Sequence, residues 1–233
     1  MDTLPTTLGP HPAVVLLAPK DLQTWPWCRD GLLNYAKPGH IIVVGRRDLA
    51  SAVAGPNISF IDQDALVPGV TARLFAAPRA GWYFQQILKL GLAMNLRSEY
   101  YLVVDSDVVF VRSVNFFSQG KPLYAVGSEH HAPYFDAYRE LLGRDANREY
   151  SFIAHHMVFR SQVVIELLSS FRAPQPWWQA IADYVTPRPP LYSLSQFSEY
   201  ETYGHFLNIT TLSVRGRRRA LRDTRSRRRN LSR

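Results

Sequence analysis

Residues 100–112 read Tyr-Tyr-Leu-Val-Val-Asp-Ser-Asp-Val-Val-Phe-Val-Arg, and this stretch decides the fold class. The apolar run from Tyr101 to Val104 is rich in β-branched and aromatic residues, which predicts a strand buried on both faces. An ionised carboxylate is costly inside a sheet unless it is paired or bound to a metal. We therefore expect a buried strand that ends at Asp105.

The tripeptide Asp105-Ser106-Asp107 has two interpretations. Its carboxylates would offer hard oxygen ligands to a divalent cation in a cleft. Alternatively, it is an Asp-rich turn whose side chains bond to their own backbone. The same pattern occurs at Asp62-Gln63-Asp64, where no second apolar run follows, and there we expect a strand-end turn. The tripeptide alone does not separate the two interpretations, so the surrounding chain must.

The first half of the chain alternates between two kinds of apolar pattern. Strands are expected over residues 13–18, 40–44 and 58–61, and helices over 21–35 and 81–96. Strand, helix and strand in this succession build a parallel sheet covered by helices. We therefore predict an α/β fold, a single Rossmann-like domain with a central, mostly parallel sheet flanked by helices.

The second half of the chain is less regular. Two strands are expected over residues 122–127 and 151–160, and the helices over 133–142, 161–170, 177–184 and 197–206. We expect Ser161 to cap the helix that it begins, because serine is a preferred residue at helix N-termini. Ser198 suggests a helix start at the cleft, directly before two acidic residues.

Length and composition favour one globular domain. The 233 residues, of which 46% are hydrophobic, suffice for a full core. We divide them into a flexible N-terminus (1–12), the α/β domain (13–212) and an Arg-rich tail (213–233). No apolar run approaches the ~18 residues of a membrane span. No secretory signal is visible, and the single Cys28 cannot form an internal disulfide, so we expect a cytoplasmic protein.

The formal net charge of +8 belongs to the tail. Residues 215–233 contain ten Arg and one Asp, a net charge of +9, so the rest of the chain carries −1. A nearly neutral body does not favour specific nucleic-acid binding. The tail could contact anionic lipids, which would place the protein peripherally at the inner face of the membrane. It could also bind nucleic acid without specificity, or remain a solvated extension.

Four segments, in this order, resemble one family of bacterial and algal glycosyltransferase-like proteins. They are Gly81–Leu90, Tyr101–Phe110, Ser151–Arg160 and Ser198–Gly204, and the resemblance covers roughly residues 12–210. The strand that ends in an Asp-x-Asp motif also resembles the GT-A class of nucleotide-sugar glycosyltransferases. The resemblance implies a GT-A-like domain, a nucleotide-diphosphate sugar as donor and Mn²⁺ or Mg²⁺ as cofactor. The acceptor would be a glycan or another hydroxyl compound.

The resemblance also implies roles for single residues. Asp105 and Asp107 would bind the metal, and His205 is a candidate for a third ligand. The candidates for contact with the donor are Lys20, Asp21, Asp62, Gln85, Gln86, Lys89, Ser106, His155 and His156. The candidates for the general base, which takes the proton of the acceptor hydroxyl in an inverting transfer, are Glu199 and Glu201. Residues two apart on a helix point about 200° apart, so only one of them can face the cleft, and we favour Glu199.

Two other functions stay open at this point. A nucleotidyltransferase of similar architecture would make a nucleotide-sugar, but that class normally has a Gly-rich basic loop after the first strand. Here residues 18–21 read Ala-Pro-Lys-Asp. A non-enzymatic nucleic-acid-binding protein is supported by the tail alone. We therefore predict a metal-dependent, inverting glycosyltransferase of glycan or polysaccharide synthesis.

Overall fold

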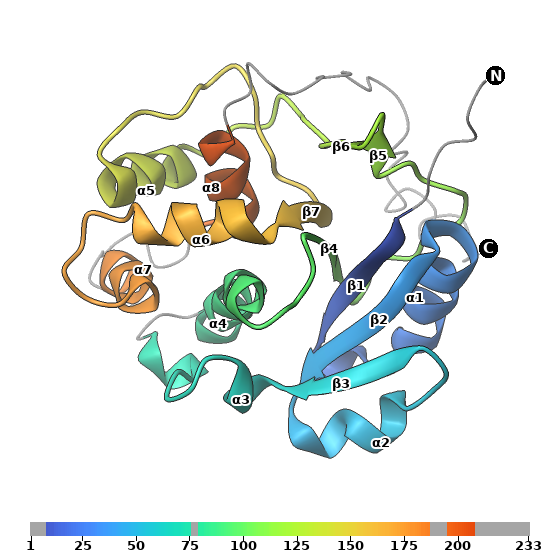
Figure 1. Ribbon diagram of the computed structural model, residues 1–233. Helices are drawn as coiled ribbons and strands as arrows, with labels where there is room; N and C mark the ends of the chain where they lie inside the picture. Colours follow the sequence, from blue (N-terminus) through green and yellow to red (C-terminus); the bar gives the residue numbers. More distant parts are fainter. Residues whose placement is uncertain (1–7, 76–78, 187–194, 208–233) are drawn as a thin grey trace, which may run out of the picture.

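The computed structural model describes residues 8–75, 79–186 and 195–207. Within these residues, five strands form one sheet in the order β3-β2-β1-β4-β7 (Figure 1). The strands are Gly9–Leu17 (β1), Pro38–Gly45 (β2), Ile58–Asp62 (β3), Tyr100–Asp105 (β4) and His156–Arg160 (β7). The first four are parallel, and β7 runs antiparallel beside β4. The prediction of an α/β fold with a mostly parallel sheet is confirmed.

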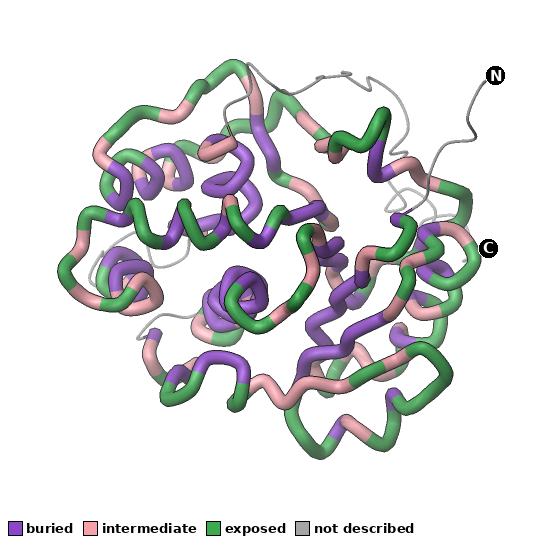
Figure 2. Tube along the Cα trace, in the orientation of Figure 1, coloured by how far each residue is buried: buried purple, intermediate pink, exposed green. Residues whose placement is uncertain are grey.

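Helices cover both faces of the sheet. The side chains of β1 point alternately into two apolar cores, one on each face. Val14 and Leu16 face the core shared with α4 (Ala80–Gly91), α5 (Ala132–Leu142), α6 (Ser161–Ser169), α7 (Trp177–Val185) and α8 (Glu199–Phe206). Val15 and Leu17 face the core shared with α1 (Trp25–Gly31) and with Val53 of α2 (Ala50–Val53). In Figure 2, most of α4 and of the central strands is coloured as buried.

The strand order reverses at β1. This strand pairs with β2 on one side and with β4 on the other, and the chain moves outward from it in both directions. Asp105 is the last residue of β4 and pairs in register with Leu16. In open α/β sheets, ligands bind in the crevice outside the carboxyl ends of the strands where the order reverses. The fold therefore places Asp105 beside that crevice.

Local helix signals are mostly confirmed. The helix expected over 21–35 begins at Trp25 with Pro26 in its first turn, and it continues as a π-helical turn over Leu32–Ala36. The helix expected over 81–96 is α4, followed by a 3₁₀ turn over Leu92–Met94. Ser198 is the N-cap of α8, and its hydroxyl accepts a hydrogen bond from the Glu201 N–H.

Four expectations are wrong in whole or in part. The strand expected over 151–160 is β7, which begins only at His156. Residues 122–127 do not form a continuous strand: Lys121–Pro122 (β6) pairs with Phe117–Ser118 (β5), and Gly127 forms an isolated bridge with Ser151. The N-cap of α6 is Arg160 rather than Ser161, whose hydroxyl donates to the Ser98 carbonyl. β1 begins at Gly9, inside the segment expected to be a flexible lead-in.

The Asp62-Gln63-Asp64 turn is confirmed. Asp62 ends β3 and caps the short helix α3 (Gln63–Leu66). The tail over 213–233 and most of the Pro-rich connector after Thr186 lie outside the described residues. In the parts of the chain that the structure describes, no helix is long and apolar enough to cross a membrane.

Candidate active site at the ends of β1 and β4

Alternation along β4 aims Asp105 at the helices. Tyr101 and Val103 face the core that contains α4 and α8, and Asp105 lies two residues further on the same face. There Lys89 of α4 meets it: the Lys89 Nζ lies 2.9 Å from Asp105 Oδ1 and 2.7 Å from Glu199 Oε1. The same ammonium donates to the Tyr200 hydroxyl at 3.2 Å. One lysine thus joins the end of β4 to the first turn of α8.

This cluster is charged although it is buried. Lys89 is 7% exposed and Glu199 is 3% exposed. Burial by itself lowers the pKa of Lys89, but the carboxylates of Glu199 and Asp105 outweigh it and raise that pKa well above its usual value. The pKa of Asp105 is lowered: burial opposes this, while the His155 and Lys89 side chains favour the carboxylate. The site therefore contains an ammonium held between two carboxylates.

The second oxygen of Asp105 faces the surface. The His155 Nδ1 lies 3.5 Å from Asp105 Oδ2, and this imidazole is 75% exposed. Its hydrogen bond with Asp105 raises the pKa of His155. Asp107 is exposed. Two carboxylates and one imidazole thus lie at the outer end of β4.

Ser106 links the Asp105-Ser106-Asp107 motif to the loop after β1. Its hydroxyl donates to Asp21 Oδ2 at 2.9 Å, and the Thr24 hydroxyl donates to its carbonyl at 3.3 Å. Asp21 ends the 3₁₀ turn Pro19–Asp21 that follows β1, and Lys20 in the same turn is exposed. The loops after β1 and β4 are therefore bonded together where the strand order reverses.

Glu199 and Glu201 point to different sides of α8. Glu201 Oε2 accepts hydrogen bonds from the Phe152 N–H and from the Ser151 hydroxyl, and its Oε1 lies 3.4 Å from His205 Nε2. Glu199 instead reaches Lys89 on the side of Asp105. The structure therefore joins only Glu199 to the Asp105 cluster.

His205 is not brought to the two aspartates. Its side chain is 1% exposed and packs against the rings of Phe135, Tyr138 and Phe152 beside Glu201. It follows Glu199 by six residues, about 9 Å along the helix and on another side of it. Among the described residues, no group of three or more His, Cys, Asp or Glu side chains could hold a metal ion. The predicted set of three ligands is therefore not assembled.

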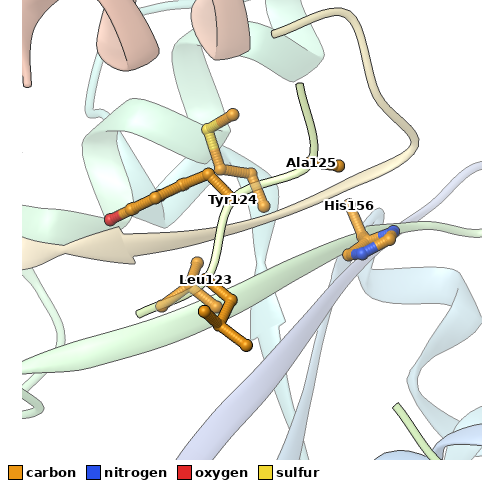
Figure 3. Close-up of a pocket in the computed structure, with 6 residues that line it drawn as sticks. Leu123, Tyr124, Ala125 and His156 are labelled. Carbon is orange, nitrogen blue, oxygen red and sulfur yellow. The ribbon is translucent and has the colours of Figure 1, made fainter. Parts of the chain in front are cut away.

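The remaining candidates for donor contact differ in how far they lie from the surface. Gln86 is 1% exposed, and its Oε1 accepts a hydrogen bond from the Glu199 N–H at 2.9 Å, so it supports α8. Gln85 is half-buried on α4. His156 packs edge-on against Phe110 and Phe116. It also lines a crevice of about 10 Å³ beside the 123–125 segment (Figure 3), which has room for about one water molecule.

A cavity of about 520 Å³ lies next to the ends of β2 and β3, and this volume lies within the usual range for small-molecule sites. Its lining comprises Arg46, Gln63, Asp64, Thr71, Ala72, Arg73 and Phe84. Asp62 is not in this lining; it caps α3 and lies 2.8 Å from the Arg47 Nε. The sequence interpretation missed Arg46 and Arg73. Arg46 directly follows β2, so the strand-end rule applied to Asp62 would have found it.

The family model that matches residues 37–225 describes a family of unknown function, DUF6492. The chain belongs to this family. No curated protein sequence matches the chain.

The similar solved structures include two glycosyltransferases, the class that the sequence motifs resemble. The bifunctional glycosyltransferase WbbM, in its apo form, has a TM-score of 0.47 at 16% identity over 81% of this chain. The galactosyltransferase LgtC, in complex with donor and acceptor sugar analogs, has a TM-score of 0.42 at 15% identity over 76% of this chain. The matches span 38% of the WbbM chain and 66% of the LgtC chain.

A third similar structure is the 4-diphosphocytidyl-2C-methyl-D-erythritol synthase from Anaerococcus prevotii. Its TM-score is 0.41 at 13% identity, and the match covers 76% of this chain and 83% of that one. At these identities and TM-scores, the residues of the site must carry the functional conclusion.

Proposed function

We propose that the protein is a glycosyltransferase that binds a nucleotide-diphosphate sugar at the carboxyl ends of β1, β2 and β4. The observation that carries the proposal is the position of Asp105 and Asp107. They lie at the end of β4, the strand beside β1, at which the sheet order reverses, and Ser106 between them is bonded to Asp21 after β1. Polar groups at this place in an open α/β sheet face its ligand crevice.

Asp105 and Asp107 are the proposed ligands of Mn²⁺ or Mg²⁺. Lys89 engages one oxygen of Asp105, whose side chain is 30% exposed, and Asp107 is exposed. Mg²⁺ is commonly held by one or two carboxylates, with water and substrate phosphates completing its coordination, so these residues fit it without His205. When bound, the ion would stabilise the negative charge of the departing diphosphate.

The cavity of about 520 Å³ is the proposed site of the nucleoside. Phe84 offers it an apolar surface, while Arg46 and Arg73 offer positive charge. In the order of the sheet, the end of β1 lies between the end of β2 and the end of β4. Lys20 and Asp21 therefore lie between this cavity and Asp105, where a diphosphate would connect nucleoside and sugar. His155 and Gln85 stay as further candidates for donor contact.

Glu199 is the proposed general base, because it shares Lys89 with Asp105. Glu201 instead accepts from the Ser151 hydroxyl and the Phe152 N–H and lies beside His205. An inverting transfer needs such a carboxylate to take the acceptor proton. Glu199→Gln should abolish transfer while nucleotide binding is retained. Glu201→Gln is the matched control, and it should lower stability more than it lowers the transfer rate of the folded protein. Transfer by Glu199→Gln at the parent rate would assign the base elsewhere.

A thermal-shift screen tests the proposed function. Nucleoside diphosphates and nucleotide-sugars are added with Mn²⁺ or with a chelator. A ligand at a hundred times its Kd stabilises the native state by about 2.7 kcal/mol, so the correct donor should raise Tm by several degrees. The part of the shift that depends on Mn²⁺ should vanish in Asp107→Asn. If no nucleotide-sugar shifts the parent protein with or without Mn²⁺, the proposal is wrong. A shift with nucleoside triphosphates alone would favour a nucleotidyltransferase.

A further inference from the structure

We infer that Lys89 is a positioning residue, which holds the metal-binding end of β4 and the base-bearing first turn of α8 at one spacing. The inference rests on the proposed function, since that function gives Asp105 and Glu199 their roles. Lys89 itself is 7% exposed, and its partners hold its ammonium inside the protein. It therefore acts through those partners rather than on the substrate.

The three hydrogens of the ammonium have three acceptors. A lysine ammonium has three donors and no acceptor. The described acceptors are Asp105 Oδ1 at 2.9 Å, Glu199 Oε1 at 2.7 Å and the Tyr200 hydroxyl at 3.2 Å. The ammonium also lies 4.4 Å from the centroid of the Tyr200 ring. With every donor used, the lysine fixes the relative position of these groups.

The backbone around Lys89 is held as firmly as its side chain. The Lys89 carbonyl accepts a hydrogen bond from the Tyr101 hydroxyl at 3.1 Å, which ties α4 to β4. Gln86, one turn earlier on α4, accepts a hydrogen bond from the Glu199 N–H at 2.9 Å. One side of α4 therefore contacts both β4 and the start of α8, and Lys89 is where the two sets of contacts meet.

Stability alone is a poor reason for this arrangement. Replacing a buried ion pair by well-packed apolar residues is often neutral or stabilising, so such a pair is weak evidence of a contribution to stability. Asp105 is also 30% exposed at its side chain, so water could solvate it without Lys89. A lysine that nevertheless takes one oxygen of Asp105 leaves only Oδ2, which lies 3.5 Å from the exposed His155 imidazole, for a cation.

Loss of Lys89 should therefore affect the affinity for Mn²⁺ and the rate of donor cleavage differently. Without Lys89, the site loses a positive charge and Asp105 is free to turn, so the affinity for Mn²⁺ should be unchanged or higher. The rate of donor cleavage should fall, because the cation and Glu199 are no longer held in register. A misplacement of about 1 Å at a reacting group costs roughly 10²-fold in rate. A purely structural role would lower binding and rate together.

The test uses the full chain and four variants. Lys89→Met leaves Glu199 charged and unpaired in the interior, so Lys89→Met/Glu199→Gln is made beside it to remove that charge. Glu199→Gln alone is the reference for the double variant. Glu201→Gln is the matched control, because it makes the same change two residues away on α8. Circular dichroism verifies the fold, the electron paramagnetic resonance signal of free Mn²⁺ gives its Kd, and nucleoside diphosphate release gives kcat and KM.

Lys89→Met should bind Mn²⁺ at least as tightly as the parent, with kcat for donor hydrolysis reduced roughly 10²-fold. In the Glu199→Gln background the ion pair with Asp105 can still be lost, so Lys89→Met should lower kcat there by about a further tenfold through Asp105 alone. Glu201→Gln should keep the parent Kd and kcat within about twofold. The inference is overturned if the double variant and Glu199→Gln hydrolyse the donor equally, or if binding and rate fall together. A parent protein that neither binds Mn²⁺ nor cleaves a donor overturns the proposed function itself.

Discussion

Two Asp-x-Asp tripeptides follow parallel strands of the same sheet and have different surroundings. Asp62, after β3, caps α3 through the Asp64 N–H and contacts Arg47, which is 86% exposed. Asp105, after β4, contacts the buried Lys89. β3 is an edge strand, whereas β4 lies beside the reversal of the strand order. The place of the strand in the sheet, rather than the tripeptide, decides what its carboxylates contact.

The largest expected difference between the motifs is in activity. Asp105→Asn should reduce Mn²⁺-dependent release of nucleoside diphosphate by at least about 10²-fold, the scale on which losing an electrostatic stabiliser of the transition state acts. Asp62→Asn should stay within about twofold of the parent. Equal losses in the two variants would mean that both motifs contact the donor, and the comparison would fail.

Asp105 and Asp107 should contribute differently to stability, and this difference is smaller. Asp105→Asn removes a hydrogen-bonded charge from Lys89 and should lower the free energy of unfolding by about 1–2 kcal/mol. Asp107→Asn changes an exposed side chain and should stay within about 0.5 kcal/mol. Urea unfolding with a chelator present measures both values. A larger effect at Asp107 would show that its carboxylate has a structural role.

The Asp62-Gln63-Asp64 motif should stabilise the fold because Asp62 caps α3. Asp62→Ala should cost about 1 kcal/mol of unfolding free energy, because it removes the N-cap of α3. Arg47→Ala should have almost no effect, since exposed ion pairs contribute little. The same urea experiment compares them. If Arg47→Ala costs as much as Asp62→Ala, the ion pair rather than the cap stabilises this turn.

The smallest expected effect concerns pH beside β4. Burial lowers the pKa of His156, so the folded protein binds fewer protons at this residue than the unfolded chain. Its stabilising contribution is complete above the unfolded value of about 6.5 and is lost as the pH falls below it. His156→Phe, which keeps an aromatic ring beside Phe110 and Phe116, should reduce the dependence of Tm on pH below about 6.5. An unchanged dependence would assign it to other groups, such as His11, whose pKa burial also lowers.

Some expectations failed where the outcome depended on distant partners. The segment over 122–127 has strand-like residues, but its ends pair with Phe117–Ser118 and with Ser151 rather than with a strand of the central sheet. Ser161 has the chemistry of an N-cap, yet its hydroxyl donates to the Ser98 carbonyl. No sequence pattern indicated that Gln86 and Lys89, which stay predicted to lie near the donor, contact the first turn of α8. The residues next to these positions in the sequence do not indicate which distant partners they contact.

The sequence by itself determined the α/β class, the buried strand that ends at Asp105, the N-cap at Ser198 and the divergence of Glu199 from Glu201. Each of these follows from side chains close together along the chain, through strand alternation or helix periodicity. Only the tertiary structure decided that Lys89 joins Asp105 to Glu199, residues 16 and 110 positions away from it. It also decided that His205 lies among aromatic rings. Such contacts depend on how α4 and α8 pack on the sheet, and no short stretch of sequence encodes that packing.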